Sequence, residues 1–234
     1  MIIYQGPSML DGSPIVAIMT GVDKPSQNEK TGPIPQVWIL RSDVEPTTAA
    51  RAGADASVCG DCPLRQVGNP ATGARGGSKG TACYVVLHRA PLSVWRTFTR
   101  GGYRPLDATA VARHATVRLG AYGDPAAVPL DVWDRLATVG PRLLGYTHAW
   151  RYAPQGYARH CMASVETAAD MAHAHAHGYR TFRVLSPGDV TGPGEAVCPA
   201  SEEGGFRRTC ATCKACNGRR DTTDTRASIT IRSH

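Results

Sequence analysis

The sequence predicts an α/β fold built around a largely parallel sheet. Two observations lead to this prediction. Two β-rich apolar runs, at 14–22 and 36–44, stand on either side of a polar turn segment near the N-terminus. Beyond residue 115, strand-like apolar runs alternate with amphipathic stretches of helical length, a pattern that produces right-handed βαβ units. With 234 residues, the chain is long enough to bury a sizeable core.

The N-terminal segment, residues 1–58, is expected to be rich in β-structure and to pack on the core. Its apolar runs PIVAIMTGV and QVWILRSDV flank the turn segment DKPSQNEKTGP, so we expect two paired strands. The following residues 45–56 suit a short helix that leads to the first cysteine pair.

The core is expected over residues 59–190. It begins with a Gly-rich loop between Cys59 and Cys83, which has too few apolar residues for regular structure, and continues with an amphipathic helix containing Val94, Trp95 and Phe98. The remaining elements follow in alternation: strands at 115–123, 142–150, 160–165 and 179–187, and helices at 126–140 and 166–178. Residues 191–234 form a Cys-rich tail that ends in the strand ASITIRSH.

Composition excludes several classes of protein. Apolar residues make up 42% and charged residues 19% of the chain, which is typical of a globular protein. No apolar run approaches the roughly 20 residues needed to cross a membrane. The start MIIYQGPSMLDG lacks the basic segment and apolar stretch of a secretory signal. We therefore expect a cytoplasmic protein without a membrane partner.

The formal net charge of +7 favours a nucleic-acid or nucleotide partner. An alternative explanation stays open, because the chain uses arginine far more than lysine and is rich in Ala and Gly. A GC-rich genome produces this bias without any selection for binding.

Four cysteines near the C-terminus have the spacing of a metal centre. In a reducing compartment, clustered cysteines are metal ligands or redox groups more often than disulfides. The run CATCKAC places three thiols at Cys-x2-Cys-x2-Cys spacing, and a remote fourth cysteine is followed by Pro199. This arrangement favours a [4Fe–4S] cluster, with a four-cysteine zinc site as the alternative. The expected ligands are Cys198, Cys210, Cys213 and Cys216.

The other four cysteines suggest a second site. Cys59 and Cys62 form a Cys-x2-Cys turn, and Cys83 stands at the far end of the Gly-rich loop. The fourth ligand is either Cys161 or a group from outside the protein, and Cys161 could equally be a small buried apolar residue. An open fourth position would allow an exogenous ligand to bind iron.

Residues at the C-terminal ends of the predicted parallel strands are candidates for catalysis, because sites in such sheets collect there. Asp124 follows one strand and is either a general base or hydrogen-bond anchor, or simply part of a Gly-Asp turn. Tyr146 and His148 belong to a later strand and are expected to face the Cys59/Cys62/Cys83 site.

The motifs together resemble a family of cysteine-rich bacteriophage proteins of unassigned function. The similarity covers about residues 55–234 and rests on CGDCP, ACYV, VRLGAYGDPAAVPLDVWDRLA, LLGYTHAW and the closing Cys-Pro with its three spaced cysteines. The resemblance implies a partial (half) βα barrel related to radical S-adenosylmethionine enzymes, which hold [4Fe–4S] clusters at strand ends. Those enzymes normally carry Cys-x3-Cys-x2-Cys, which this chain lacks, so cleavage of S-adenosylmethionine is not assigned.

Two functions of different class follow. The first is a phage-type iron–sulfur protein with one or two [4Fe–4S] clusters that acts on or binds nucleic acid or nucleotides in the host-cell cytoplasm. In its enzymatic form the first cluster is reactive and the second is structural. The second function is a zinc-stapled module that binds nucleic acid or a host protein without catalysis.

Overall fold

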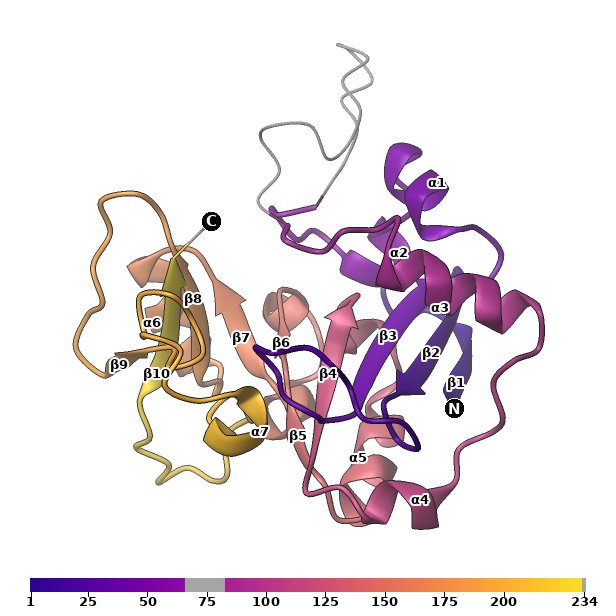
Figure 1. Ribbon diagram of the computed structural model, residues 1–234. Helices are drawn as coiled ribbons and strands as arrows, with labels where there is room; N and C mark the ends of the chain where they lie inside the picture. Colours follow the sequence, from indigo (N-terminus) through magenta and orange to yellow (C-terminus); the bar gives the residue numbers. More distant parts are fainter. Residues whose placement is uncertain (66–82, 233–234) are drawn as a thin grey trace.

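Every strand pairing from β3 onward is parallel. The computed structural model describes residues 1–65 and 83–232, and its strands form two five-stranded sheets in the orders β1-β2-β3-β4-β5 and β6-β7-β8-β10-β9. Figure 1 shows the strands in this succession from β1 at the right to β9 at the left. The mixed α/β class and the parallel strands predicted from the sequence are confirmed.

The bounds of the elements are as follows. The strands are β1 (Ile2–Pro7), β2 (Pro14–Thr20), β3 (Gln36–Arg41), β4 (Thr116–Tyr122), β5 (Arg142–Leu144), β6 (Tyr146–Thr147), β7 (Met162–Val165), β8 (Thr181–Leu185), β9 (Glu195–Val197) and β10 (Ser228–Arg232). The α-helices are α1 (Pro46–Arg51), α2 (Ala56–Cys59), α3 (Ala90–Thr99), α4 (Ala108–Ala112), α5 (Leu130–Thr138), α6 (Ala168–Ala176) and α7 (Cys210–Cys213). Three 3₁₀ helices are η1 (Pro125–Ala127), η2 (Ala149–Arg151) and η3 (Gln155–Arg159).

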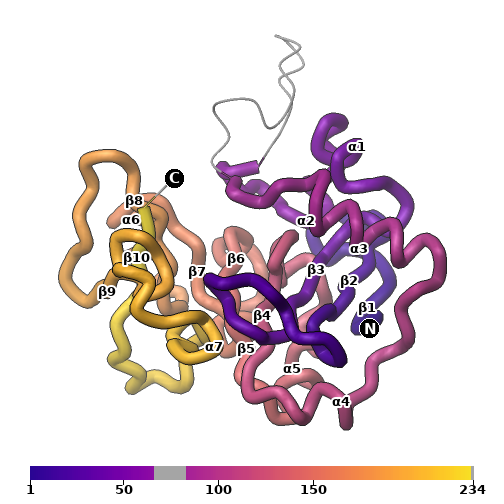
Figure 2. The backbone as a smooth tube through the Cα atoms, in the orientation of Figure 1, coloured from indigo at the N-terminus to yellow at the C-terminus, as the bar shows by residue number. Residues whose placement is uncertain are grey.

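The N-terminal segment is part of the first sheet. β2 pairs antiparallel with β3 over Ile15–Thr20, as the two apolar runs predicted, and β3 then pairs in parallel with β4 of the core. The first strand was not expected from its Gly- and Pro-containing sequence, yet β1 pairs antiparallel with β2. The loop 23–35 between β2 and β3 crosses toward α7, where the Lys30 carbonyl accepts a hydrogen bond from the Cys210 amide at 3.1 Å (Figure 2).

Gly145 marks the junction of the two sheets. The sequence predicted one strand over 142–150, but it is divided there into β5 and β6, and η2 begins at Ala149. A Cβ atom at Gly145 would lie 2.9 Å from the Cβ of Leu119, so only glycine fits. The amide of Gly145, which lies between β5 and β6, donates a hydrogen bond to the Cys216 carbonyl at 2.9 Å. The C-terminal tail is therefore attached to the backbone at the point where the sheets meet.

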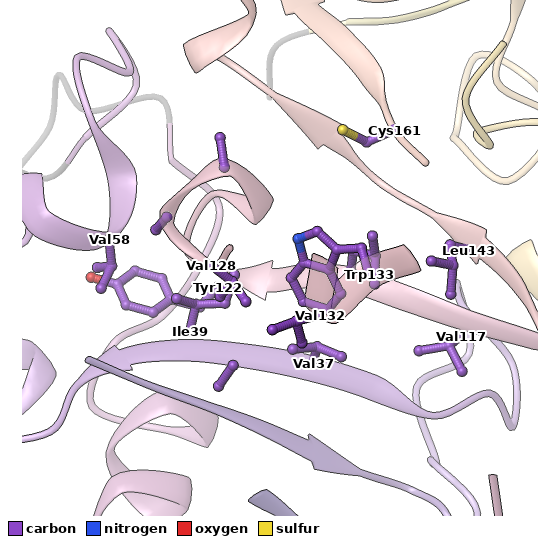
Figure 3. Close-up of a cluster of buried hydrophobic side chains, with 14 of the residues drawn as sticks. Val37, Ile39, Val58, Val117, Tyr122, Val128, Val132, Trp133, Leu143 and Cys161 are labelled. Atoms are coloured by element: carbon purple, nitrogen blue, oxygen red, sulfur yellow. The ribbon is translucent and has the colours of Figure 1, made fainter. Parts of the chain in front are cut away.

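The main hydrophobic core lies between α5 and the first sheet. The helix predicted over 126–140 is present as α5, and its Val132, Trp133 and Leu136 are all buried. Figure 3 shows Val132 and Trp133 beside Val37 of β3. The indole Nε1 of Trp133 donates to the Pro125 carbonyl at 2.9 Å, which satisfies the polar atom of a fully buried ring.

A second, smaller core forms where the tail covers the second sheet. Met162, Phe182 and Ile229 of the sheet pack with Cys198 and Ala200 of the tail. The tail therefore contributes both an apolar residue, Ala200, and a cysteine, Cys198, to this core.

The last two strands do not follow chain order in the sheet. β10, predicted from ASITIRSH, inserts between β8 and the edge strand β9, and it is parallel to both. The short β9 had not been expected. A buried ion pair connects it to β8: Arg183 Nη2 lies 2.6 Å from Glu195 Oε2, and the two side chains are 6% and 0% exposed.

No helix in the described part of the chain is long and apolar enough to span a bilayer.

We expect Glu195→Gln to lower the free energy of unfolding by about 3 kcal/mol at pH 7, because it leaves the buried Arg183 charge without a counter-ion. Burial raises the pKa of Glu195, but its bonds to Arg183 and the Gly192 amide outweigh this and lower the pKa. The stabilising contribution is therefore complete above the unfolded pKa of about 4.3 and is lost as pH falls through the lower folded value.

Urea unfolding at pH 7 and pH 3 measures this effect. The gap between wild type and variant should shrink at pH 3, whereas Glu202→Gln, at an exposed site, should have little effect at either pH. An equal gap at both pH values would contradict the assignment.

Candidate functional site

Seven of the eight cysteines line two adjoining cavities. The first has a volume of about 110 Å³ and is lined by Cys59, Cys62 and Cys83. The second has a volume of about 310 Å³. Its cysteines are Cys198, Cys210, Cys213 and Cys216. The cavities have four wall residues in common, namely Leu64, Tyr84, Tyr146 and His148.

The turn that carries Cys59 and Cys62 is held by Arg65. Cys59 ends α2, and Gly60 follows it with a φ of +60°, a conformation that favours glycine. Arg65 donates to the carbonyls of Gly60 and Gly53, each at 3.0 Å, and forms an ion pair with the buried carboxylate of Asp55. The guanidinium therefore keeps the residues around both cysteines in one conformation.

The thiols of the first cavity affect one another. Burial raises the pKa of Cys59 well above its ordinary value, and the negative charges of Asp55, Cys62 and Cys83 raise it further. Burial also raises the pKa of Cys83, and Cys62 adds to this. A bound cation would reverse the effect, because coordination deprotonates thiols.

The hydroxyl of Tyr122 lies beside the same thiols. This residue ends β4, lines the first cavity and is 6% exposed. Burial raises the pKa of Tyr122 well above its ordinary value, and the charges of Cys59 and Asp55 and a hydrogen bond with Cys59 raise it further. The hydroxyl is therefore protonated at neutral pH and lies next to the Cys59 thiol.

Asp124 anchors the backbone at the ends of two strands. One carboxylate oxygen accepts from the Ala126 amide at 2.8 Å and the other from the His148 amide at 2.7 Å. Burial raises the pKa of Asp124, while hydrogen bonds to Thr147, Ala126 and His148 oppose the rise. The Ala126 contact is that of the turn residue and the His148 contact that of the hydrogen-bond anchor, while the role of general base stays a prediction.

The imidazole of His148 connects a thiol with a carboxylate. Its Nε2 lies 2.9 Å from Glu166 Oε1 and 3.8 Å from Cys62 Sγ. Burial lowers the pKa of His148, but the hydrogen bonds and charges of Cys62 and Glu166 outweigh this and raise the pKa to about 10. The ring is therefore charged at neutral pH. Glu166 was missed in the sequence, although it directly follows a predicted strand, as Asp124 does.

Cys161 lies apart from both cavities. It is fully buried in the main hydrophobic core (Figure 3), and its thiol donates to the Tyr157 carbonyl at 3.4 Å. It lines neither cavity. The structure does not bring Cys161 to Cys59, Cys62 and Cys83, and its side chain occupies the place of a small apolar residue.

Arg180 of the β7–β8 connection holds the tail that carries the second set of cysteines. The residue is 5% exposed, and its guanidinium donates to three carbonyls of the tail, at 2.9 Å to Ala215, 2.8 Å to Asn217 and 2.5 Å to Ala227. The bonds lie on both sides of the exposed loop 219–226 and fix the backbone next to Cys216.

The four thiols of the second cavity are electrostatic neighbours. Burial raises the pKa of Cys216, and the charges of Cys198, Cys210 and Cys213 raise it further. Burial likewise raises the pKa of Cys198, with added contributions from Cys210 and Cys213. The tail thus brings the remote Cys198 to the three spaced cysteines. All four carry free thiols.

Within residues 1–65 and 83–232, no group of three or more His, Cys, Asp or Glu side chains is arranged so that it could hold a metal ion. The thiols line the walls of the two cavities.

An arginine and two tyrosines stand between the cysteine sets. Arg118 Nη2 donates to the hydroxyls of Tyr84, at 2.6 Å, and Tyr146, at 3.2 Å, and the two hydroxyls are 3.4 Å apart. The Tyr146 ring stacks on Phe182 with centroids 4.4 Å apart. Sequence reasoning missed Arg118, because in the strand ATVRLGAYG it looks like an ordinary polar position.

Comparison of the chain with family models, with curated proteins and with solved structures found no match.

We expect Arg180→Met to loosen the tail without unfolding the first sheet. Three carbonyls lose a charged donor, which should lower the free energy of unfolding by about 2–3 kcal/mol and open the second cavity. The rate of thiol labelling at Cys216, measured by mass spectrometry of the metal-free protein, should rise by about tenfold or more.

The matched control is Arg100→Met, which removes an exposed arginine at the C-terminal end of α3. Unchanged labelling at Cys216 in Arg180→Met would show that the guanidinium does not hold the tail.

Proposed function

We propose that this chain is an iron–sulfur protein with one or two [4Fe–4S] clusters on a partial βα barrel. One observation supports this above all: seven cysteines from separated segments line two adjoining cavities, and within each cavity the thiols are electrostatic neighbours. Four thiolates are the usual ligand set of such a cluster.

In this proposal the second cavity holds a closed cluster with a structural role. Cys198, Cys210, Cys213 and Cys216 would supply all four ligands, and Arg180 positions the tail for them. The cluster would also connect the tail to the loop 23–35 through the amide of Cys210.

The first cavity would hold the reactive cluster. Cys59, Cys62 and Cys83 supply three thiolates, which leaves one iron to bind a group from outside the protein. The hydroxyl of Tyr122 lines the same cavity next to the Cys59 thiol. The His148 Nε2 lies 3.8 Å from the Cys62 sulfur and 2.9 Å from Glu166, and Asp124 holds the His148 backbone in position.

The partial barrel is supported by strand order. The parallel strands β3, β4 and β5 lead through Gly145 directly to the parallel strands β6, β7 and β8, so the two sheets continue one another. The thiols and the ends of β4 and β6 meet at the same cavities, as expected for a barrel-like sheet with its site at the strand ends.

Zinc is the principal alternative, and it would make the chain a stapled binding module. A single tetrahedral ion needs four ligands close around one point, at about 2.3 Å for sulfur. A cluster of four irons is larger, and its ligands stand further apart. Thiols distributed over cavity walls suit the cluster better than the ion.

The proposed partner is a nucleotide or nucleic acid. The net charge of +7 supports an anionic partner in general, and the cationic residues of the second cavity support it locally.

Anaerobic purification tests the cluster assignment. We expect a brown protein with an absorbance band at about 400 nm and about four or eight irons and sulfides per chain. Cys216→Ser and Cys59→Ser should each remove up to about four irons, from the second and the first site respectively. A colourless protein with stoichiometric zinc would overturn the proposal in favour of the stapled module.

Cys161→Ser is the matched control for these variants. Its hydroxyl can still donate to the Tyr157 carbonyl, so the fold should persist and the iron content should equal that of wild type. Loss of iron from this variant would mean that Cys161 closes the first site.

A further inference from the structure

The whole net charge of the chain comes from one stretch of its sequence. Residues 62–106 contain no aspartate or glutamate, and their cations are Arg65, Arg75, Lys79, Arg89, Arg96, Arg100 and Arg104. The complete chain has 26 cations and 19 acidic residues, so the two kinds balance at 19 each outside this stretch. The formal charge of +7 is therefore concentrated on one segment, a pattern that indicates an anion-binding region.

Three of these arginines lie on one face of α3. Arg89 directly precedes the helix, Arg96 lies within it and Arg100 directly follows it. With about 100° of rotation per residue, these positions and Ser93 fall within about 60° of one another around the helix axis. All four side chains are exposed. The helix therefore carries a narrow stripe of three arginines along its length, here called the arginine stripe.

The opposite side of α3 holds the helix on the first sheet. The buried residues of the helix are Pro91, Leu92 and Val94. The indole Nε1 of Trp95 donates to the carbonyl of Arg41 at the end of β3, at 3.1 Å. Figure 1 shows α3 beside β3, with which it is in contact. The arginine stripe thus faces away from the sheet, on a helix whose position is fixed by the core.

The arginine stripe has no ion-pair partner in the part of the chain that the structure describes. None of the ion pairs there includes Arg89, Arg96 or Arg100. Glu45 is a neighbouring acid: hydrogen bonds from two threonine hydroxyls of α1 lower its pKa, and the charge of Arg96 makes a smaller contribution. The three guanidinium groups are therefore available to an anion from outside the protein.

The form of the arginine stripe favours a DNA duplex. At a rise of about 1.5 Å per residue, Arg89 and Arg100 stand about 16 Å apart along the helix, which suits several phosphates of a polymer. The major groove of B-DNA admits an α-helix, whereas the major groove of duplex RNA is too narrow for side chains to read. Single strands stack their bases on exposed aromatic rings, and none of the exposed large apolar side chains among the described residues belongs to α3.

We propose that α3 binds double-stranded DNA, with Arg89, Arg96 and Arg100 on phosphate oxygens. A guanidinium binds phosphate through paired N–H donors, so each arginine neutralises one phosphate. Leu87 lines the first cavity and lies just before the arginine stripe, so DNA bound there is close to the site of the proposed reactive cluster. This inference rests on the proposed nucleic-acid partner and narrows it to duplex DNA, on a surface outside both cavities.

Fluorescence anisotropy of the anaerobically purified protein tests the inference. The probe is a labelled DNA duplex of about 20 base pairs, titrated at several concentrations of KCl. We expect the duplex to bind with an affinity that falls steeply as salt rises, because phosphate contacts release condensed counterions. Unlabelled single-stranded DNA and polyglutamate are the competitors, and each should compete less well than unlabelled duplex.

Variants then locate the contacts. Arg89→Gln, Arg96→Gln and Arg100→Gln should each weaken binding about fivefold to tenfold at about 0.1 M KCl and reduce the salt slope by about 1, as expected for one lost phosphate contact. The triple variant should reduce the slope by about 3. All three side chains are exposed and glutamine is a good helix former, so the fold should persist. Arg142→Gln removes an exposed arginine at the start of β5 and should bind as wild type does.

Three outcomes would overturn the inference. The duplex does not bind even at low salt, the triple variant binds it with the same affinity and salt slope as Arg142→Gln, or a competitor displaces it at least as well as unlabelled duplex. Effective polyglutamate would identify an acidic protein as the partner, and effective single-stranded DNA would identify an unpaired strand. Duplex binding that persists in the triple variant contradicts only this inference and leaves the nucleic-acid partner in place. Iron is measured on the same samples, so the cluster assignment is tested independently.

Discussion

The guanidinium of Arg180 is the interaction on which the cysteine-lined region depends. It is nearly inaccessible to solvent and bonds three carbonyls of the tail. The pairing of β10 with β8 and the backbone bond from Gly145 to Cys216 hold the same part of the chain. The tail in turn packs Cys198 and Ala200 on the smaller core of Met162, Phe182 and Ile229 and forms one wall of the second cavity. One buried charge therefore contributes to apolar packing, thiol placement and cavity shape in this half of the molecule.

Buried arginines organise both cysteine sets by the same means. Arg65 bonds carbonyls of the turn around Cys59 just as Arg180 bonds carbonyls of the tail, and in each case irregular backbone is fixed without regular structure. Arg118 differs, because its described partners are two neutral hydroxyls. Arg65 also has the carboxylate of Asp55 as its counter-ion, whereas the described partners of Arg180 and Arg118 are all neutral oxygens.

The ends of β4, β6 and β7 show how the sheet aligns its polar groups. Asp124, His148 and Glu166 directly follow these strands and form a chain of contacts that reaches Cys62. Asp124 bonds the backbone, whereas the imidazole of His148 lies beside a thiol and a carboxylate, so the two side chains have different surroundings. Their proximity results from parallel strands that end at one edge.

The sequence by itself determined the features that depend on local pattern, namely the alternation of strands and helices and the apolar face of α5. It also indicated that Cys198 belongs to the same group as the three spaced cysteines. These properties follow from side-chain periodicity and short-range spacing, which are read directly along the chain. Only the tertiary structure decided that Cys161 is a core residue, that Gly145 divides a strand, and that β10 enters the sheet beside β8. It also revealed Arg118 and Glu166, whose surroundings come from segments distant in sequence. Their roles arise from contacts between remote residues, and no local pattern encodes those contacts.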